Sequence, residues 1–171
     1  GNGFELETAN DIQLTSTTVP KTITLKDITL LTTTYLNFIN VGTYSNSKNW
    51  DIVFENVVAP KNKLERIIRA PYAHLHIYGN YEVYTRAENM YIGQITVHEE
   101  ARVYGEIFYY DYSTWWFERS DCQGSLNIEA GAYVSLNGIS GATYPAIYQH
   151  FREVNVGENA TLKVNKPGNA F

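Results

Sequence analysis

Short runs in which every second residue is apolar recur along the chain, and a small polar bend interrupts each run. The clearest are LHIYGNYEV from Leu75, ITVHEEARV from Ile95, LNIEAGAYV from Leu126 and VNVGENATL from Val154. A period of two is typical of strands with one buried face. Gly, Asn and Glu in the bends suit tight turns. Each run therefore predicts a strand, a bend and a second strand.

Aligned with one another, the four runs place like residues at like positions. The predicted columns are Leu75/Ile95/Leu126/Val154, Ile77/Val97/Ile128/Val156, Tyr81/Ala101/Ala132/Ala160 and Val83/Val103/Val134/Leu162. One unit alone cannot bury its apolar side, so we expect the units to stack at the strand spacing of ~4.8 Å into a continuous core. The unequal offsets indicate coils of about twenty residues with insertions on one side. The sequence thus predicts an all-β solenoid, and a β-sandwich is the alternative, because its strands alternate too.

Two upstream runs extend this pattern towards the N-terminus. ITLKDITL from Ile23 and IVFENVVA from Ile52 carry Asp27 and Asn56 at their bends. The one helical candidate is residues 61–69 (KNKLERIIR), in which the apolar side chains share a helical face. Prolines bracket this segment, so a loop followed by a short strand is an equal interpretation.

Composition narrows the classes of protein to which the chain can belong. At 171 residues and 44% hydrophobic content we expect one folded domain spanning residues 1–171. A net charge of −5 argues against nucleic acid as a partner, and no apolar run is long enough for membrane insertion. The single cysteine, Cys122, excludes an intrachain disulfide, and no histidine accompanies it as in a catalytic thiol. The chain begins at Gly1, so we expect a fragment of a longer protein.

The matched units resemble a known architecture. Together with the terminal VNVGENATLKVN (residues 154–165) and the bends near Asp27 and Asn56, they resemble the right-handed parallel β-helix. More narrowly, they look like the pectate-lyase-like adhesive domains of Gram-positive bacterial surface adhesins, over roughly residues 20–165. The resemblance implies an extracellular, cell-wall-attached, non-catalytic adhesin domain. Its partners would be a polysaccharide, a host-surface glycan or protein, or a second copy of itself.

Pectate lyases share this fold but need clustered carboxylates for Ca²⁺ and a base that abstracts the sugar proton. In this chain Glu99 and Glu100 lie in a bend, with Arg102 two residues on. One aligned column reads Tyr78/His98/Glu129/Gly157, and no stacked Asp column is evident. We therefore expect no catalytic residue and no cofactor. A polysaccharide-lyase-like enzyme and a structural spacer remain the alternative functions.

Three smaller groupings have structural interpretations. His74 and His76 flank inward Leu75 and should face outward together, which we interpret as a surface pair without a metal, because no third ligand is evident nearby. His98 falls in the next outward column, the one that begins with Tyr78. Glu82 and Arg102 share an aligned position, which predicts an exposed ion pair worth about 0–1 kcal/mol. Tyr84 and Tyr104 would form the next column and stack.

The most aromatic stretch is IFYYDYSTWWF, residues 107–117, in which seven of eleven residues are aromatic. Strand alternation makes both of its faces aromatic, and one solenoid core can cover only one of them. It falls in the predicted insertion 106–124, and a second insertion, 138–151, brings further tyrosines to the same side. A local aromatic core and a contact surface for ligands are both open. The predicted ligand-binding residues are Tyr109, Tyr110, Tyr112, Trp115, Trp116, Tyr144 and Tyr148.

Overall fold

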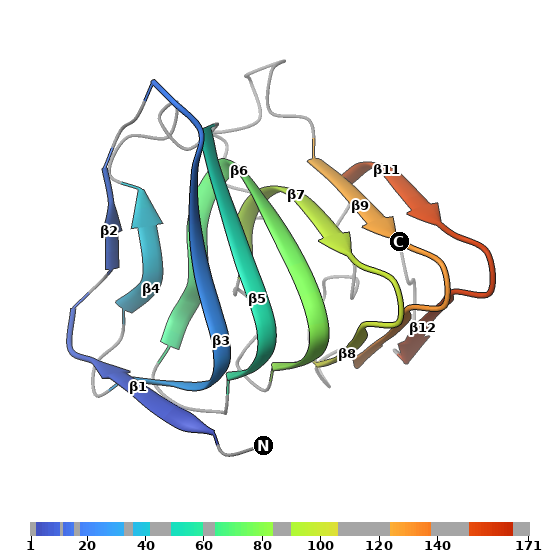
Figure 1. Cartoon of the computed structure of the whole chain (residues 1–171), viewed down its shortest axis with the longest axis horizontal. Coiled ribbons are helices and arrows are strands. Elements are labelled where there is room, and N and C mark those ends of the chain that lie inside the picture. Colours follow the sequence, from blue (N-terminus) through green and yellow to red (C-terminus); the bar gives the residue numbers. More distant parts are fainter. Residues whose placement is uncertain are drawn as a thin grey trace.

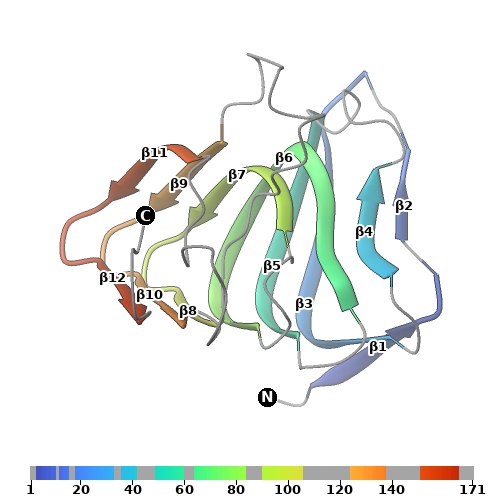
Figure 2. The ribbon, with the colours of Figure 1, turned by 180° about the vertical axis from the view of Figure 1, so that it is seen from behind.

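The computed structural model describes residues 3–10, 12–15, 18–32, 36–41, 49–59, 64–83, 90–105, 124–137 and 151–165. They form one twelve-stranded sheet that winds around a core (Figures 1 and 2). The strands are β1 (Phe4–Thr8), β2 (Ile12–Leu14), β3 (Lys21–Thr32), β4 (Leu36–Val41), β5 (Trp50–Ala59), β6 (Leu64–Val83), β7 (Met90–Val97), β8 (Arg102–Gly105), β9 (Gly124–Ile128), β10 (Tyr133–Asn137), β11 (Phe151–Val156) and β12 (Thr161–Asn165).

All the strand pairs are parallel, and they fall on three faces. The first face contains β2, β4 and the beginnings of β6 and β7. The second contains the first part of β3 and of β5, the middle of β6, the end of β7, and then β9 and β11. The third contains β1, the second part of β3 and of β5, the end of β6, and then β8, β10 and β12. The chain is therefore a parallel β-solenoid, as the alternation predicted.

The long strands β3, β5 and β6 turn from one face to the next without a loop, which Figure 1 shows as ribbons that curve around the corner. Residues 64–69 form the first part of β6, so for them the strand interpretation is confirmed and the helix is wrong. No helix among the described residues has the length and apolarity needed to cross a membrane.

The two apolar columns predicted for the first strand of each unit are confirmed, with their members paired in register. Leu75 pairs with Ile95, Ile95 with Leu126, and Leu126 with Val154. The companion column, Ile77/Val97/Ile128/Val156, runs beside it. Both columns extend into the upstream coils: Ile23/Ile52 continues the first and Leu25/Phe54 the second. Side chains from these columns are buried in the core in the middle coils. Ile23 in the first coil and Val154 in the last are partly buried, and Val156 is 49% exposed.

The bends between the second and third faces are of two kinds. In the upstream coils Asp27 and Asn56 both have a φ of 53°, and Gly79 has a φ of 61°. Asn and Gly tolerate this left-handed conformation better than other residues, and a short polar side chain can hydrogen-bond there. A Cβ on Gly79 would also collide with Oδ1 of Asn56.

In the downstream coils the bends are longer and are closed by backbone hydrogen bonds. Ala101, Ala132 and Ala160 each donate their N–H to the carbonyl three residues earlier, at 3.0, 3.2 and 3.2 Å. Ala101 and Ala132 are buried, so the predicted alanine column is confirmed for these coils. The bends also bond to one another, since Tyr133 N–H donates to the Ala101 carbonyl at 2.8 Å.

Because the two kinds of bend differ in length, the register predicted for the second strand of each unit is wrong at the boundary between them. Tyr81 pairs with Val103 rather than with Ala101, and Val83 pairs with Gly105. The physical reason is the length of the bend, because Tyr81 follows Ile77 by four positions whereas Val103 follows Val97 by six.

The expected side-by-side placement of Glu82 and Arg102 is therefore wrong. Glu82 pairs with Tyr104, and Arg102 pairs with Asn80. Tyr84, the expected partner of Tyr104, lies outside the described residues. The Tyr104 ring instead lies 5.7 Å from that of Tyr133, centroid to centroid.

Candidate functional site

The outer side of the second face carries a group of ring and carboxylate side chains from four neighbouring strands. We call this group the histidine ladder. Its members are Asp51 on β5, His74, His76 and Tyr78 on β6, Thr96 near the end of β7, His98 directly after β7, and Glu129 directly after β9. Parallel pairing explains the arrangement, because outward residues at equal register on stacked strands lie about 4.8 Å apart.

The alternation of β6 sets the direction of its histidines. Leu75 and Ile77 are fully buried in the core, so His74, His76 and Tyr78 point to the other side. This confirms the prediction that the two imidazoles face outward together. Their ring centroids are 3.9 Å apart.

A hydrogen-bonded chain of side chains crosses the coils of the ladder. Nδ1 of His76 lies 2.9 Å from Nε2 of His98, and Nδ1 of His98 lies 3.0 Å from Oε2 of Glu129. The same Glu129 oxygen accepts the backbone N–H of Glu99 at 3.2 Å. His98 is thus fixed from both sides, one column beyond His76 as predicted.

Tyr78 stacks on the ring of His98. The two rings are parallel within 2°, with their centroids 4.0 Å apart. The Tyr78 side chain reaches the surface, where the residue is 40% exposed. The column Tyr78/His98/Glu129 that the sequence predicted therefore exists as a physical contact, and it presents an aromatic surface.

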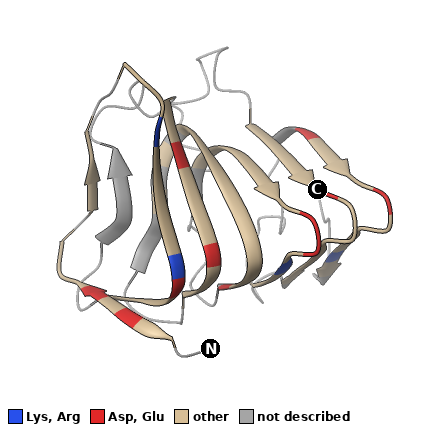
Figure 3. Ribbon diagram, in the orientation of Figure 1, with Lys and Arg blue, Asp and Glu red and all other residues tan. Residues whose placement is uncertain are grey.

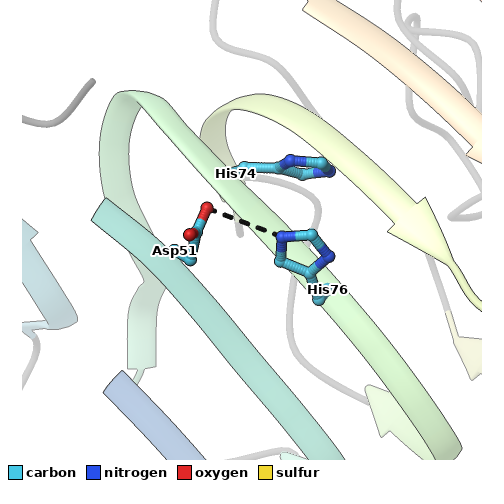
Figure 4. Close-up of side chains that lie close together, drawn as sticks. All are labelled: Asp51, His74 and His76. Carbon is cyan, nitrogen blue, oxygen red and sulfur yellow. Dashed lines mark ion pairs between the residues drawn. The ribbon is translucent and has the colours of Figure 1, made fainter. Parts of the chain in front are cut away.

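Asp51 brings a carboxylate to the two histidines of β6. Asp51 on β5 pairs in register with His74 on β6, and its Oδ1 lies 3.6 Å from Nε2 of His76 (Figure 4). One donor atom from each of Asp51, His74 and His76 lies within 4.8 Å of the other two, an arrangement that could hold a metal ion. The sequence indicated no third ligand near the histidine pair, and the structure supplies one.

His74 is a half-buried ring of the ladder. Its Nε2 lies 2.7 Å from Oγ1 of Thr96, which is itself buried. Burial, and secondarily the neighbouring His76, lower the pKa of His74 from 6.5 to about 4. His74 is therefore a neutral ring, with a lone pair, at neutral pH.

Charged groups flank the ladder on β3 and β5. Lys26 and Glu55 form an ion pair at 2.7 Å, and the pKa of Lys26 is raised by its hydrogen bond to Glu55. Acidic positions occur on β5 and in the turns of the downstream coils, as Figure 3 shows.

A hollow lies at the upstream bends. It is lined by Gly3, Asp27, Ile28, Thr29, Asn56, Val58, Asn80 and Glu82, with a volume of about 400 Å³. Within the described residues this hollow and the histidine ladder are separate surfaces, because the hollow lies on the third face and its corner.

The predicted ligand-binding residues Tyr109, Tyr110, Tyr112, Trp115, Trp116, Tyr144 and Tyr148 all lie outside the described residues. What the sequence reasoning missed is the position of Asp51. Its signal was available, since Asp51 precedes Ile52 as His74 precedes Leu75, and matching these two runs places the carboxylate beside the imidazole.

Comparison with protein-family models, with curated proteins and with solved structures found no significant match to the chain.

Proposed function

We propose that the chain is a non-catalytic, extracellular adhesive domain that binds an extended glycan along its second face. The observation that carries the proposal is the Tyr78–His98 ring stack on a regular parallel sheet, in which Tyr78 is exposed. Sugar rings have apolar faces that pack on aromatic rings, while their hydroxyl groups bond to carboxylates and amides.

The face around the stack is suited to a polymer rather than to a small ligand. Its outward side chains repeat at the strand spacing, so polar groups of one kind recur at a fixed interval. Asn127 and Asn155 form one such repeat, with Nδ2 of Asn155 donating to Oδ1 of Asn127 at 2.8 Å. Side chains held by their neighbours lose little freedom on binding, which favours affinity.

The solenoid and the resemblance to pectate-lyase-like adhesive domains of Gram-positive surface proteins support attachment to a cell wall through parts of a longer protein. The aromatic insertions would add a second contact surface, for glycans, proteins or self-association. A structural spacer and a polysaccharide lyase are the competing functions.

A glycan array and analytical ultracentrifugation on the same protein separate these functions. We expect binding to one class of polysaccharide that Tyr78→Ala weakens by about tenfold, in line with losing one aromatic anchor. Tyr104→Ala is the matched control, because Tyr104 is 37% exposed on the third face. Equal effects of the two substitutions, or binding to no glycan, would contradict the proposed surface.

An absorbance assay for unsaturated uronides on pectin or polygalacturonate tests for the lyase. With Ca²⁺ supplied, we expect no increase in absorbance. A steady increase that a chelator abolishes would show that the domain is an enzyme and overturn its non-catalytic assignment.

A further inference from the structure

We infer that Asp51, His74 and His76 form a binding site for a divalent transition-metal ion of the Zn²⁺ class. The inference is independent of the proposed glycan binding, because it uses the donor atoms of the ladder and not its aromatic surface. Figure 4 shows Asp51 facing His76 across the β5–β6 pair, with the His74 ring beside that of His76.

The donor atoms are already gathered. In a tetrahedral site with bonds of roughly 2.0–2.1 Å, ligand atoms lie about 3.3 Å apart. Asp51 Oδ1 and His76 Nε2 are 3.6 Å apart, and all three donors lie within 4.8 Å of one another. Small side-chain rotations close this gap. The strands that carry the donors are paired in register, so the backbone need not move.

The hydrogen bonds around His76 leave the ring nitrogen that faces Asp51 free to coordinate. A carboxylate only accepts hydrogen bonds, so Nδ1–H of His98 donates to Glu129. When both imidazoles are neutral, Nε2 of His98 then accepts from Nδ1–H of His76, at 2.9 Å.

His76 Nε2 consequently presents a lone pair to a carboxylate oxygen at 3.6 Å, which is a contact between two acceptors. A cation between these atoms turns the repulsion into attraction. A ligand histidine whose other nitrogen is held by a histidine and a carboxylate is the arrangement that orients metal-binding imidazoles.

His74 fits the same role. Its Nε2 is engaged by Thr96 at 2.7 Å, which leaves Nδ1 as the nitrogen open to an ion. Two imidazoles and one carboxylate favour Zn²⁺, Ni²⁺ or Cu²⁺ over Ca²⁺ or Mg²⁺, which prefer oxygen ligands. Three protein donors leave a fourth position for water or for an anionic group of a ligand.

The test is calorimetric titration of Zn²⁺ into untagged, metal-stripped protein carrying Cys122→Ser, which removes the single thiol as a competing ligand. Co²⁺ absorption reports the coordination geometry. We expect one ion per chain and visible d–d bands of a tetrahedral site. His76→Ala and Asp51→Ala should each weaken binding by about tenfold or more while circular dichroism stays unchanged, because both side chains point away from the core.

Glu153→Ala is the matched control, since Glu153 is an exposed carboxylate on β11 of the same face. Its removal changes the net charge as Asp51→Ala does, but takes no donor from the cluster, so we expect unchanged affinity. Three results overturn the inference: no Zn²⁺ uptake by the parent protein, undiminished uptake by His76→Ala or Asp51→Ala, or an equal loss in Glu153→Ala.

Discussion

Asn56 donates a hydrogen bond from its side-chain Nδ2 to Oδ1 of Asp27 on the preceding coil, at 2.8 Å. Its own Oδ1 accepts the backbone N–H of Asn80 on the following coil, at 3.0 Å. Both Asp27 and Asn56 have left-handed backbone conformations. One side chain thus ties three successive bends together and fixes the corner between the second and third faces.

Two substitutions of Asn56 should therefore separate the contribution of its hydrogen bonds to stability from the contribution of its backbone conformation. Asn56→Gly keeps the left-handed φ at no steric cost and loses only the bonds, so we expect about 1 kcal/mol of destabilisation. Asn56→Ala loses the bonds and adds the strain of a Cβ in this conformation, for a total of about 2 kcal/mol. Urea unfolding measures both changes. Equal stability of the two variants would mean that the backbone conformation is unstrained.

Tyr81 offers a substitution that should raise stability. Its ring is fully buried beside Phe54, with centroids 5.5 Å apart, and among the described residues its hydroxyl has no hydrogen-bond partner. Burial accordingly raises the pKa of Tyr81 far above 10. Tyr81→Phe removes the unsatisfied group and keeps the ring, so we expect a gain of about 1 kcal/mol in the free energy of unfolding. A loss of stability would show that the hydroxyl has a partner.

Alternation was enough to predict the solenoid and the inward columns of the second face, because a one-residue shift would turn every apolar side chain outward. Alternation was not enough to predict the register of the second strand of each unit. Tyr81 and Ala101 are both small or apolar enough for an inward position, and the sequence pattern does not reveal that one bend is two residues longer. The position of Asp51 follows only when the run from Ile52 is matched to the run from Leu75, because that match places Asp51 beside His74.

Val97 tests the core column. It is fully buried between Ile77 and Ile128, so Val97→Asp places a charge without a partner in the core. We expect a loss of about 4 kcal/mol or more, which unfolds the domain or nearly so. Gln94→Asp introduces the same side chain at an exposed position of the same strand and should change stability by less than about 0.5 kcal/mol. A folded Val97→Asp protein would contradict the packing of this column.

Trp115 and Trp116 lie outside the described residues, and the prediction for them comes from the sequence. Neighbouring residues of a strand point to opposite faces, so one ring should be covered and the other should be available to a ligand. Replacing the covered tryptophan by Ala should lower the melting temperature. Replacing the other should leave it unchanged and weaken glycan binding or self-association. If both variants lose stability alike and neither changes binding, the stretch is core and the adhesive surface lies elsewhere.

His74 should make the stability of the metal-free protein depend on pH. Its pKa is about 4 in the folded state, against the ordinary 6.5 expected in the unfolded chain. Between these values the unfolded chain takes up a proton that the folded protein does not bind. The free energy of unfolding therefore falls as the pH is lowered from about 6.5 to about 4, and it is unaffected by this group above and below that window.

His74→Gln isolates this contribution, because Gln keeps a polar group near Thr96 and does not titrate. The ring is only half buried, so solvent screening reduces the full effect. Between about pH 6.5 and about pH 4 we expect the parent protein to lose about 1–2 kcal/mol more of its free energy of unfolding than His74→Gln loses. Urea unfolding at pH 7 and at pH 4, with a chelator present to exclude metal ions, measures that difference. The substitution replaces no other ionisable residue, so a difference between the two proteins traces to His74 and the groups that it contacts. The same pH dependence in both proteins would mean that His74 takes up its proton without resistance, and that burial does not keep the ring neutral.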